Sequence, residues 1–90
     1  MVYYQIIANR IANLCKRRNF SITNLAKMSN VSQSTLDNIM HGRSKNPGVQ
    51  TLHKIALTFN MTVAEFLDFP ELNDYSFDDD TDTDDDLFEE

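Results

Sequence analysis

The stretch Leu25-Ala-Lys-Met-Ser-Asn-Val-Ser-Gln-Ser-Thr-Leu-Asp-Asn-Ile-Met-His-Gly42 decides the fold. Asn30 stands between two short helical patterns, and Asn adopts the left-handed backbone conformation of a sharp turn more readily than most residues. Ser32 can cap the next helix, which is predicted over about residues 32–40 and ends before Gly42. Two short helices joined by a tight turn form a helix-turn-helix.

Apolar residues at helical spacing predict three further helices around this unit. Ser21 can cap the second helix, the one that leads into the turn. Thr62-Val-Ala-Glu65 is a capping box that predicts a fifth helix, which Pro70 is expected to end. The first and fourth helices are indicated by stripes that recur every three or four residues: Ile7, Ile11 and Leu14, and then Leu52, Ile55, Ala56 and Phe59 before Asn60.

Length and composition favour one small all-α domain. The chain has 90 residues, of which 41% are hydrophobic, with only two Gly and two Pro. The predicted architecture is a five-helix bundle over residues 1–70, followed by an acidic low-complexity tail at 71–90 that is expected to be disordered. No apolar run approaches the roughly 18 residues of a membrane span. A lone cysteine, Cys15, suits a reducing compartment, so a cytoplasmic location is expected.

Charge is divided unevenly along the chain. The net charge is −6. All eight Lys and Arg lie in residues 1–70 with three acids, which gives +5, whereas the remaining eleven of the fourteen acids lie in residues 71–90, which gives −11. A basic body beside an acidic tail suggests nucleic-acid binding by the body, although a solvated surface with a plain solubility tail fits the charges equally well.

The helix-turn-helix stretch resembles the Cro/phage-repressor family, also called the XRE family. The resemblance spans roughly residues 5–68, because further segments fall where that family places its first, fourth and fifth helices: Arg10-Ile-Ala-Asn-Leu14, Asn46-Pro-Gly, Leu52-His-Lys-Ile-Ala56 and Thr62-Val-Ala-Glu-Phe66. It implies a sequence-specific DNA-binding transcriptional regulator whose third helix enters the major groove of double-stranded DNA.

The third helix carries the predicted base contacts. Leu36 and Ile39 are its inward pair, which leaves short polar side chains on the outward arc. Gln and Asn can pair with adenine through two hydrogen bonds, and a major groove about 12 Å wide admits one helix. By position, the resemblance assigns base contacts to Gln33, Ser34 and Asn38, with Asp37 beside them.

The predicted phosphate contacts flank that helix. Cations and amides can bind the DNA backbone at any sequence, and they supply affinity and register. The free amides at the start of the second helix can also bind a phosphate. In the family that the sequence resembles, the loop after the third helix touches the phosphate backbone. The residues predicted to contact phosphates are therefore Ser21, His41, Arg43, Lys45 and Asn46.

The sequence departs from the family pattern at three places. Ile22 replaces a Gln that contacts phosphate, so this side chain is predicted to be lost as a contact or used for packing. Asn30 replaces the common Gly of the turn. Cys15 and Met40 stand where the family often has an ion pair, and an apolar contact is predicted instead; a redox role for Cys15 is the alternative.

Functions other than DNA binding have less support in the sequence. An enzyme is not expected, because the chain has two His and one Cys and lacks a metal-ligand cluster or a phosphate-binding glycine loop, so no cofactor or metal is predicted. The competing hypothesis is a protein-interaction adapter, antirepressor-like or antitoxin-like, on the same fold. For the tail at 71–90, the hypotheses are mimicry of DNA charge, docking of a partner protein, or solubility alone.

A homodimer is also expected, because helix-turn-helix proteins commonly bind palindromic sites as pairs. Its interface is predicted at the apolar residues near the end of the domain, which otherwise would complete the core. These residues are Phe66, Leu67, Phe69 and Leu72.

Overall fold

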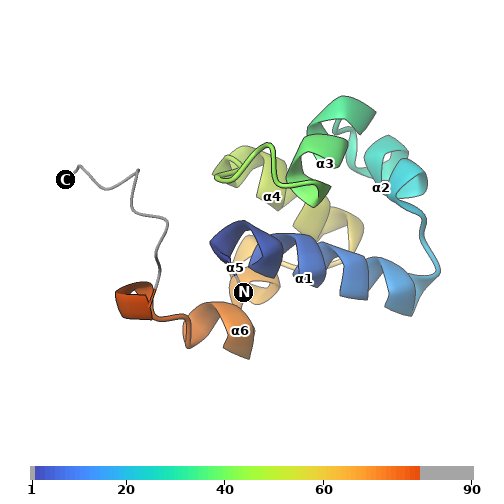
Figure 1. Cartoon of the computed structure of the whole chain (residues 1–90). Coiled ribbons are helices and arrows are strands. Elements are labelled where there is room, and N and C mark those ends of the chain that lie inside the picture. The colour runs from blue at the N-terminus through green and yellow to red at the C-terminus, as the bar shows by residue number, and fades with distance from the viewer. Residues whose placement is uncertain (1, 80–90) are drawn as a thin grey trace.

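The computed structural model describes residues 2–79, and their regular structure is entirely helical (Figure 1). The prediction of an all-α fold is therefore confirmed. The tail at 71–90 is predicted to be disordered, but its residues 71–79 include most of a short helix and a 3-10 turn, and residues 80–90 lie outside the described residues. The elements are α1 (Tyr3–Arg18), α2 (Ile22–Ser29), α3 (Gln33–Met40), α4 (Val49–Thr58), α5 (Val63–Leu67), α6 (Pro70–Asn73) and a 3-10 turn, η1 (Phe77–Asp79).

Local hydrogen bonds set the helix starts where the sequence predicts them. The hydroxyl oxygens of Ser21, Ser32 and Thr62 each accept the backbone N–H three residues later, at 3.0 Å. Glu65 completes the capping box, because its carboxylate accepts the backbone N–H of Thr62 at 2.8 Å. A cap of this kind contributes roughly 1 kcal/mol, so these polar residues define helix boundaries without any tertiary contact.

Asparagine residues make the sharp turns after three of the helices. Asn19, Asn30 and Asn60 all have positive φ angles, of 59°, 59° and 60°. The left-handed conformation turns the chain away from the helix and lets amides beyond the helix end bond its last carbonyls. The turn residue Asn30 is therefore confirmed in the role that the sequence predicts for it.

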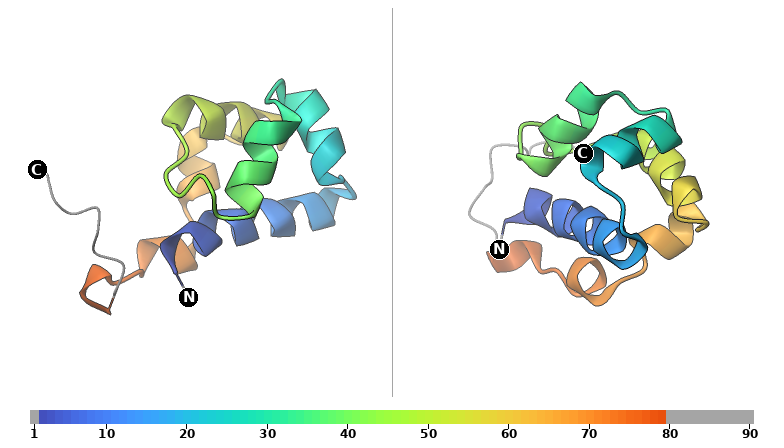
Figure 2. Two further views of the ribbon diagram at one scale, coloured as in Figure 1. Left: turned by 45° about the horizontal axis from the view of Figure 1, so that its top comes forward. Right: turned by 90° about the vertical axis from the view of Figure 1, so that its right-hand side faces the viewer.

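The helix α1 lies between two groups of elements, as both views of Figure 2 show. It packs against α2 and α3 on one side and against α6 on the other, while α4 packs against α2 and α5. The apolar faces of these helices meet in one core. Its completely buried members include Ile11, Leu25, Leu36, Ile39, Ile55, Phe59 and Phe66.

The structure corrects the predicted end of the domain. Pro70 does not end the fifth helix, which stops at Leu67; it occupies the first turn of a sixth helix, α6, where its missing N–H leaves no bond unmade. The five-helix prediction is therefore one short helix too few within the described residues. This helix crosses the predicted boundary at residue 70 and packs against α1.

The predicted dimer interface is wrong for two of its four residues. Phe66 is 0% exposed and Phe69 is 8% exposed within the single chain, so both complete the core. Leu67 and Leu72 are half-buried against the same core. Phe66 and Phe69 are unavailable to a second copy, and dimerisation itself stays a prediction.

Two arginine side chains of α1 bond carbonyl oxygens at the ends of distant helices. Arg10 donates from Nε to the Phe66 carbonyl at 2.9 Å and from a terminal nitrogen to the Glu65 carbonyl at 3.1 Å. Arg18 donates to the Phe59 carbonyl at 2.9 Å. Helix ends leave such carbonyls without intrahelical partners, so these arginines hold α1 against the ends of α4 and α5.

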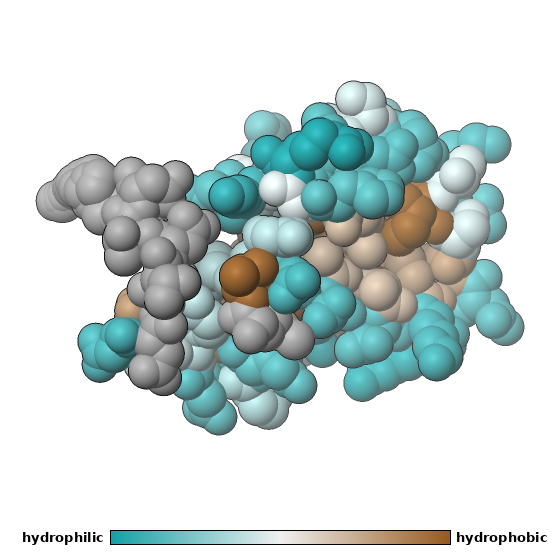
Figure 3. All heavy atoms as spheres, in the orientation of Figure 1, coloured by the Kyte–Doolittle hydropathy of each residue, from teal (hydrophilic) through white to brown (hydrophobic). Residues whose placement is uncertain are grey.

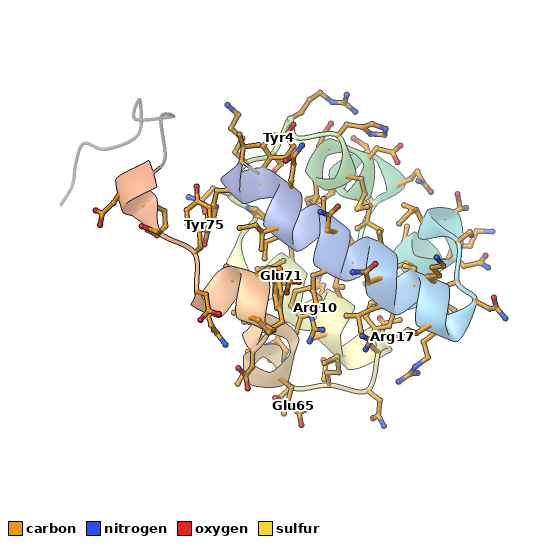
Figure 4. The ribbon with its side chains drawn as sticks, turned by 60° about the horizontal axis from the view of Figure 1, so that its bottom comes forward. Tyr4, Arg10, Arg17, Glu65, Glu71 and Tyr75 are labelled. Carbon is orange, nitrogen blue, oxygen red and sulfur yellow. The ribbon has the colours of Figure 1, made fainter. Side chains whose placement is uncertain are left out.

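Burial shapes the environment of Arg10 as well. Its guanidinium carbon lies 4.8 Å from the centre of the Phe69 ring, within the range of a cation–π contact. Burial, and then the neighbouring charge of Arg17, lower the pKa of Arg10, although a guanidinium remains charged in proteins. Figure 4 shows Arg10 and Arg17 along α1 on the side facing α5.

No helix within residues 2–79 is long and apolar enough to cross a bilayer.

Candidate nucleic-acid interface

The helix α3 is held by its apolar side and displays its polar side. Leu36 and Ile39 are fully buried, as the sequence predicts. Gln33 and Ser34, in the first turn, are exposed, whereas two other predicted base-contacting residues further along, Asp37 and Asn38, are half-buried. The predicted base-contacting side chains therefore share the outer side of one helix.

Asp37 bonds two other predicted contact residues. Gln33 donates from Nε2 to a carboxylate oxygen of Asp37 at 3.0 Å. Nδ1 of His41 lies 2.8 Å from the backbone carbonyl oxygen of Asp37, one turn further along. Asp37 therefore fixes the orientation of the Gln33 amide through its nitrogen, and Oε1 of Gln33 takes no part in this bond.

Asn38 is bonded to Arg43 in the loop between α3 and α4, residues 41–48. Nε of Arg43 donates to Oδ1 of Asn38 at 2.8 Å. Because a guanidinium only donates, the amide atom that faces it must be the oxygen. The backbone carbonyl oxygen of Asn38 also accepts the backbone N–H groups of Arg43 and Ser44, at 2.9 and 3.0 Å. Asn38 thus connects the helix that faces outward to the loop that follows it.

Gly42 and Tyr4 set the course of the α3–α4 loop. Gly42 has φ of +79°, a conformation that side chains rarely adopt, and a methyl group added there would overlap the ring of Tyr4 from α1. Arg43, Lys45 and Asn46 are exposed in this loop. The close packing of Tyr4 on Gly42 therefore positions the basic part of the loop relative to α3.

The predicted phosphate contact at Ser21 lies apart from the loop. Ser21 is at the start of α2, at the opposite end of the helix-turn-helix from residues 41–48 (Figure 1). Its hydroxyl oxygen is engaged in capping α2. Ile22, the next residue, is half-buried against the core, which confirms the prediction that it is used for packing.

Positive charge dominates the part of the chain that forms this surface. Residues 21–48 carry three cations, Lys27, Arg43 and Lys45, and one acid, Asp37. In Figure 3 the upper part of the molecule, where α2 and α3 lie, is covered mostly by hydrophilic side chains, and hydrophobic ones lie between it and α1. An anion approaching α3 therefore meets mainly cations and neutral polar groups.

Cys15 and Met40 both belong to the core region, as an apolar replacement for an ion pair requires. Cys15 is buried, and Met40 packs against the core from the end of α3. Burial raises the pKa of the Cys15 thiol. Because the thiolate is the reactive form, this environment disfavours the redox alternative.

Sequence reasoning missed the side chains that position the surface. The bond between Asn38 and Arg43, the contact of Tyr4 with Gly42, and the Arg10 bonds to α5 were not foreseen. The sequence offered one indication of the bond between Asn38 and Arg43, because the two residues are only five positions apart.

Known proteins are similar to the part of the chain that contains the helix-turn-helix. Residues 10–71 match the family model of the Cro/C1-type HTH DNA-binding domain. The HTH-type transcriptional regulator SlrR of Bacillus subtilis (strain 168) is 42% identical over 53 residues, which are 59% of this chain and 35% of that protein. The chain thus spans about a third of the length of this curated relative.

Two solved structures share the fold. The crystal structure of the prophage Lp1 protein 11 superposes with a TM-score of 0.73 at 30% identity, over 81% of this chain and 97% of that one. An HTH_3 family transcriptional regulator from Vibrio cholerae superposes with a TM-score of 0.64 at 34% identity, over 72% of this chain and 36% of that one. The chain therefore belongs to the family of the Cro/C1-type HTH DNA-binding domain.

Proposed function

We propose that this protein is a sequence-specific transcriptional regulator that inserts α3 into the major groove of double-stranded DNA. The observation that carries the proposal is the shared outer side of α3, where Gln33, Ser34 and Asn38 lie, while Leu36 and Ile39 hold the helix to the core. An α-helix fits the major groove, and amide side chains can distinguish adenine there.

The contacts divide into two kinds with different consequences. Gln33 and Asn38 read bases, with Ser34 and Asp37 beside them. Arg43, Lys45 and Asn46 bind phosphates on one side of α3, with His41 at the end of the helix, and the start of α2 at Ser21 binds phosphates on the other. Phosphate contacts fix the register of the protein, and base contacts determine the sequence.

The bond between Arg43 and Asn38 links the two kinds. It turns the oxygen of the Asn38 amide toward the loop, at 2.8 Å from Arg43. The amide nitrogen is left to donate to N7 of an adenine, while the second lone pair of the oxygen can accept from N6. Arg43 would therefore orient a base-reading side chain as well as attract the phosphate backbone.

Selection from a randomised duplex pool tests the proposal. The full chain at moderate salt should retain a defined sequence, and two inverted half-sites would indicate a dimer. Since Phe66 and Phe69 are inside the core, such a dimer must use other residues. Retention of no preferred sequence would contradict sequence-specific binding and favour the protein-interaction adapter.

Two substitutions separate the proposed roles. Asn38→Ala should relax the preference at one base pair and cost about 1–3 kcal/mol on the selected site only. Arg43→Ala should weaken binding to all duplexes and lower the salt dependence by about one phosphate equivalent, as well as loosening Asn38. Arg17→Ala removes the same charge from α1, in the groove beside α6, and should change neither property.

A further inference from the structure

Three aromatic side chains fasten the chain after α6 to the first turn of α1. The ring centres of Tyr3 and Tyr75 are 5.1 Å apart, those of Tyr3 and Phe77 are 5.4 Å apart, and those of Tyr75 and Phe77 are 5.0 Å apart. These distances are typical of favourable aromatic pairs. This aromatic cluster (Tyr3, Tyr75 and Phe77) fixes the position of the chain at Phe77, three residues before the acidic segment 80–90 begins.

That point lies close to the α3–α4 loop. Tyr4 follows Tyr3 in α1 and packs against Gly42, the residue before Arg43. Figure 4 shows Tyr4 and Tyr75 on different sides of the first turn of α1. The first turn of α1 therefore lies between the aromatic cluster and the loop that is proposed to bind phosphates.

The segment that follows in the sequence, residues 80–90, is strongly acidic and long enough to reach the loop. Residues 80–90 carry no basic residue, and an extended chain advances at most about 3.6 Å per residue, or roughly 40 Å over this segment. The longest dimension of the molecule is 35 Å. The acids of the segment are Asp80, Asp82, Asp84, Asp85, Asp86, Glu89 and Glu90.

We propose that the α3–α4 loop is a docking surface for the acidic segment of the same chain, residues 80–90, which competes there with DNA. The carboxylates would take the place of phosphates beside Arg43 and Lys45. Attachment through the aromatic cluster gives the segment a high effective concentration at the loop. The docking depends only on charge and distance, whereas the competition rests on the proposed function.

A second basic surface is less suitable for the segment. Arg10 and Arg17 line a groove between α1 and α6, but Glu71 lines it too, and Asp74 lines its extension toward Tyr75. Arg10 is also engaged with the carbonyls of α5. Acidic residues therefore stand between the aromatic cluster and Arg17, whereas the α3–α4 loop has no acid within it.

Nuclear magnetic resonance of the full chain without DNA tests the docking. The reference is a variant in which every acid of residues 80–90 is replaced by its amide. Backbone amides of residues 42–46 should shift between the two proteins at low salt, and the difference should disappear at about 0.5 M salt, where the Debye length falls below roughly 5 Å. Equal spectra of the loop at low salt would overturn the proposal, as would shifts confined to the groove at Arg17.

A variant with unchanged charge tests the competition with DNA. Phe77→Ala should loosen the attachment and tighten binding to a random-sequence duplex by about threefold, because it lowers the effective concentration of the segment. Phe77 is 66% exposed, so the fold is retained; Leu57→Ala in α4, where Leu57 is 62% exposed, is the matched control and should leave affinity unchanged.

The two experiments separate failure of this inference from failure of the proposed function. If all variants bind duplexes with equal affinity, the competition is refuted while DNA binding stands. If no variant binds any duplex, DNA binding is refuted, and the spectra of the loop still decide whether the segment docks.

Discussion

The side of the molecule formed by α2, α3 and the α3–α4 loop differs from the side formed by α1, α5 and α6 in how its polar groups are bonded. On the first side, exposed or half-exposed polar side chains bond one another, as Gln33 bonds Asp37 and Arg43 bonds Asn38. On the second side, Arg10 bonds backbone carbonyls beside buried rings.

The bonds on the two sides differ in how much they contribute to the stability of the fold. A bond between two exposed side chains adds little stability, because water replaces it at small cost. Such side chains also keep donors and acceptors that remain available to a base or phosphate. The Glu65 carbonyl that Arg10 bonds also accepts the backbone N–H of Asp68, but the Phe66 carbonyl would lose its partner, because Pro70, four residues later, has no N–H to donate. The predictions below test whether stability and DNA binding divide between the two sides in this way.

Removing a buried ring should have the largest effect on stability. Phe66→Ala leaves a cavity in the core and should lower the free energy of unfolding by about 3–5 kcal/mol. Phe77→Ala removes the same ring from an exposed position and should cost less than about 1 kcal/mol. Urea unfolding followed by circular dichroism measures both; equal losses would contradict the assignment of Phe66 to the core.

The two glycines should respond in opposite ways to the same change. Gly42→Ala should destabilise the protein by about 1–3 kcal/mol, because it places a side chain at positive φ and against Tyr4. Gly48→Ala meets open space at φ of −68° and should be neutral or slightly stabilising. Thermal unfolding of the pair checks this, and a neutral Gly42→Ala would show that Tyr4 does not constrain the loop.

Replacing Arg10 by Lys should cost about 1–2 kcal/mol, because an ammonium group cannot donate along both directions of the guanidinium fork. Arg17→Lys alters an exposed cation of the same helix and should cost almost nothing. If the comparison of the two sides holds, Arg10→Lys reduces the stability while duplex affinity, measured well below the melting temperature, is unchanged. A loss of affinity at full folding would break the comparison.

Cys15 should give the smallest effect, confined to alkaline pH. Burial raises the pKa of its thiol in the folded protein, so the unfolded chain loses its proton first. The contribution of the protonated Cys15 thiol to the free energy of unfolding is therefore fully present below the pKa of the unfolded chain, near 8.5. It declines as the pH rises from there through the raised pKa of the folded protein. Unfolding free energies between pH 7 and 10 should fall more steeply for the native sequence than for Cys15→Ala.

Much of the local structure could be predicted from single stretches of sequence. Ser21, Ser32 and Thr62 start helices, and Asn30 makes the turn, because each role depends on bonds within three or four residues. The inward position of Leu36 and Ile39 follows from helical spacing in the same way. The outer residues of α3 could therefore be named in advance, although their contact with DNA remains a proposal.

The end of the domain could not be predicted by such reasoning. Pro70 was expected to stop a helix and instead starts one, since a proline serves equally well after a helix and in the first turn of the next. The sequence does not indicate whether Phe66 and Phe69 face the core or a second copy of the chain; in the structure both are buried in the core. Only the position of α1 beside them decides that question.

The sequence by itself determined the order of helices α1–α5, the caps of α2, α3 and α5, the turn at Asn30 and the polar face of the helix-turn-helix, because these depend on neighbours along the chain. The tertiary structure alone decided which side chains hold the pieces together. Arg10 meets a carbonyl 56 residues away and Arg18 one 41 residues away, and Tyr3 meets Tyr75. Contacts across such separations leave no periodic signal, since they arise only when the apolar faces have already packed.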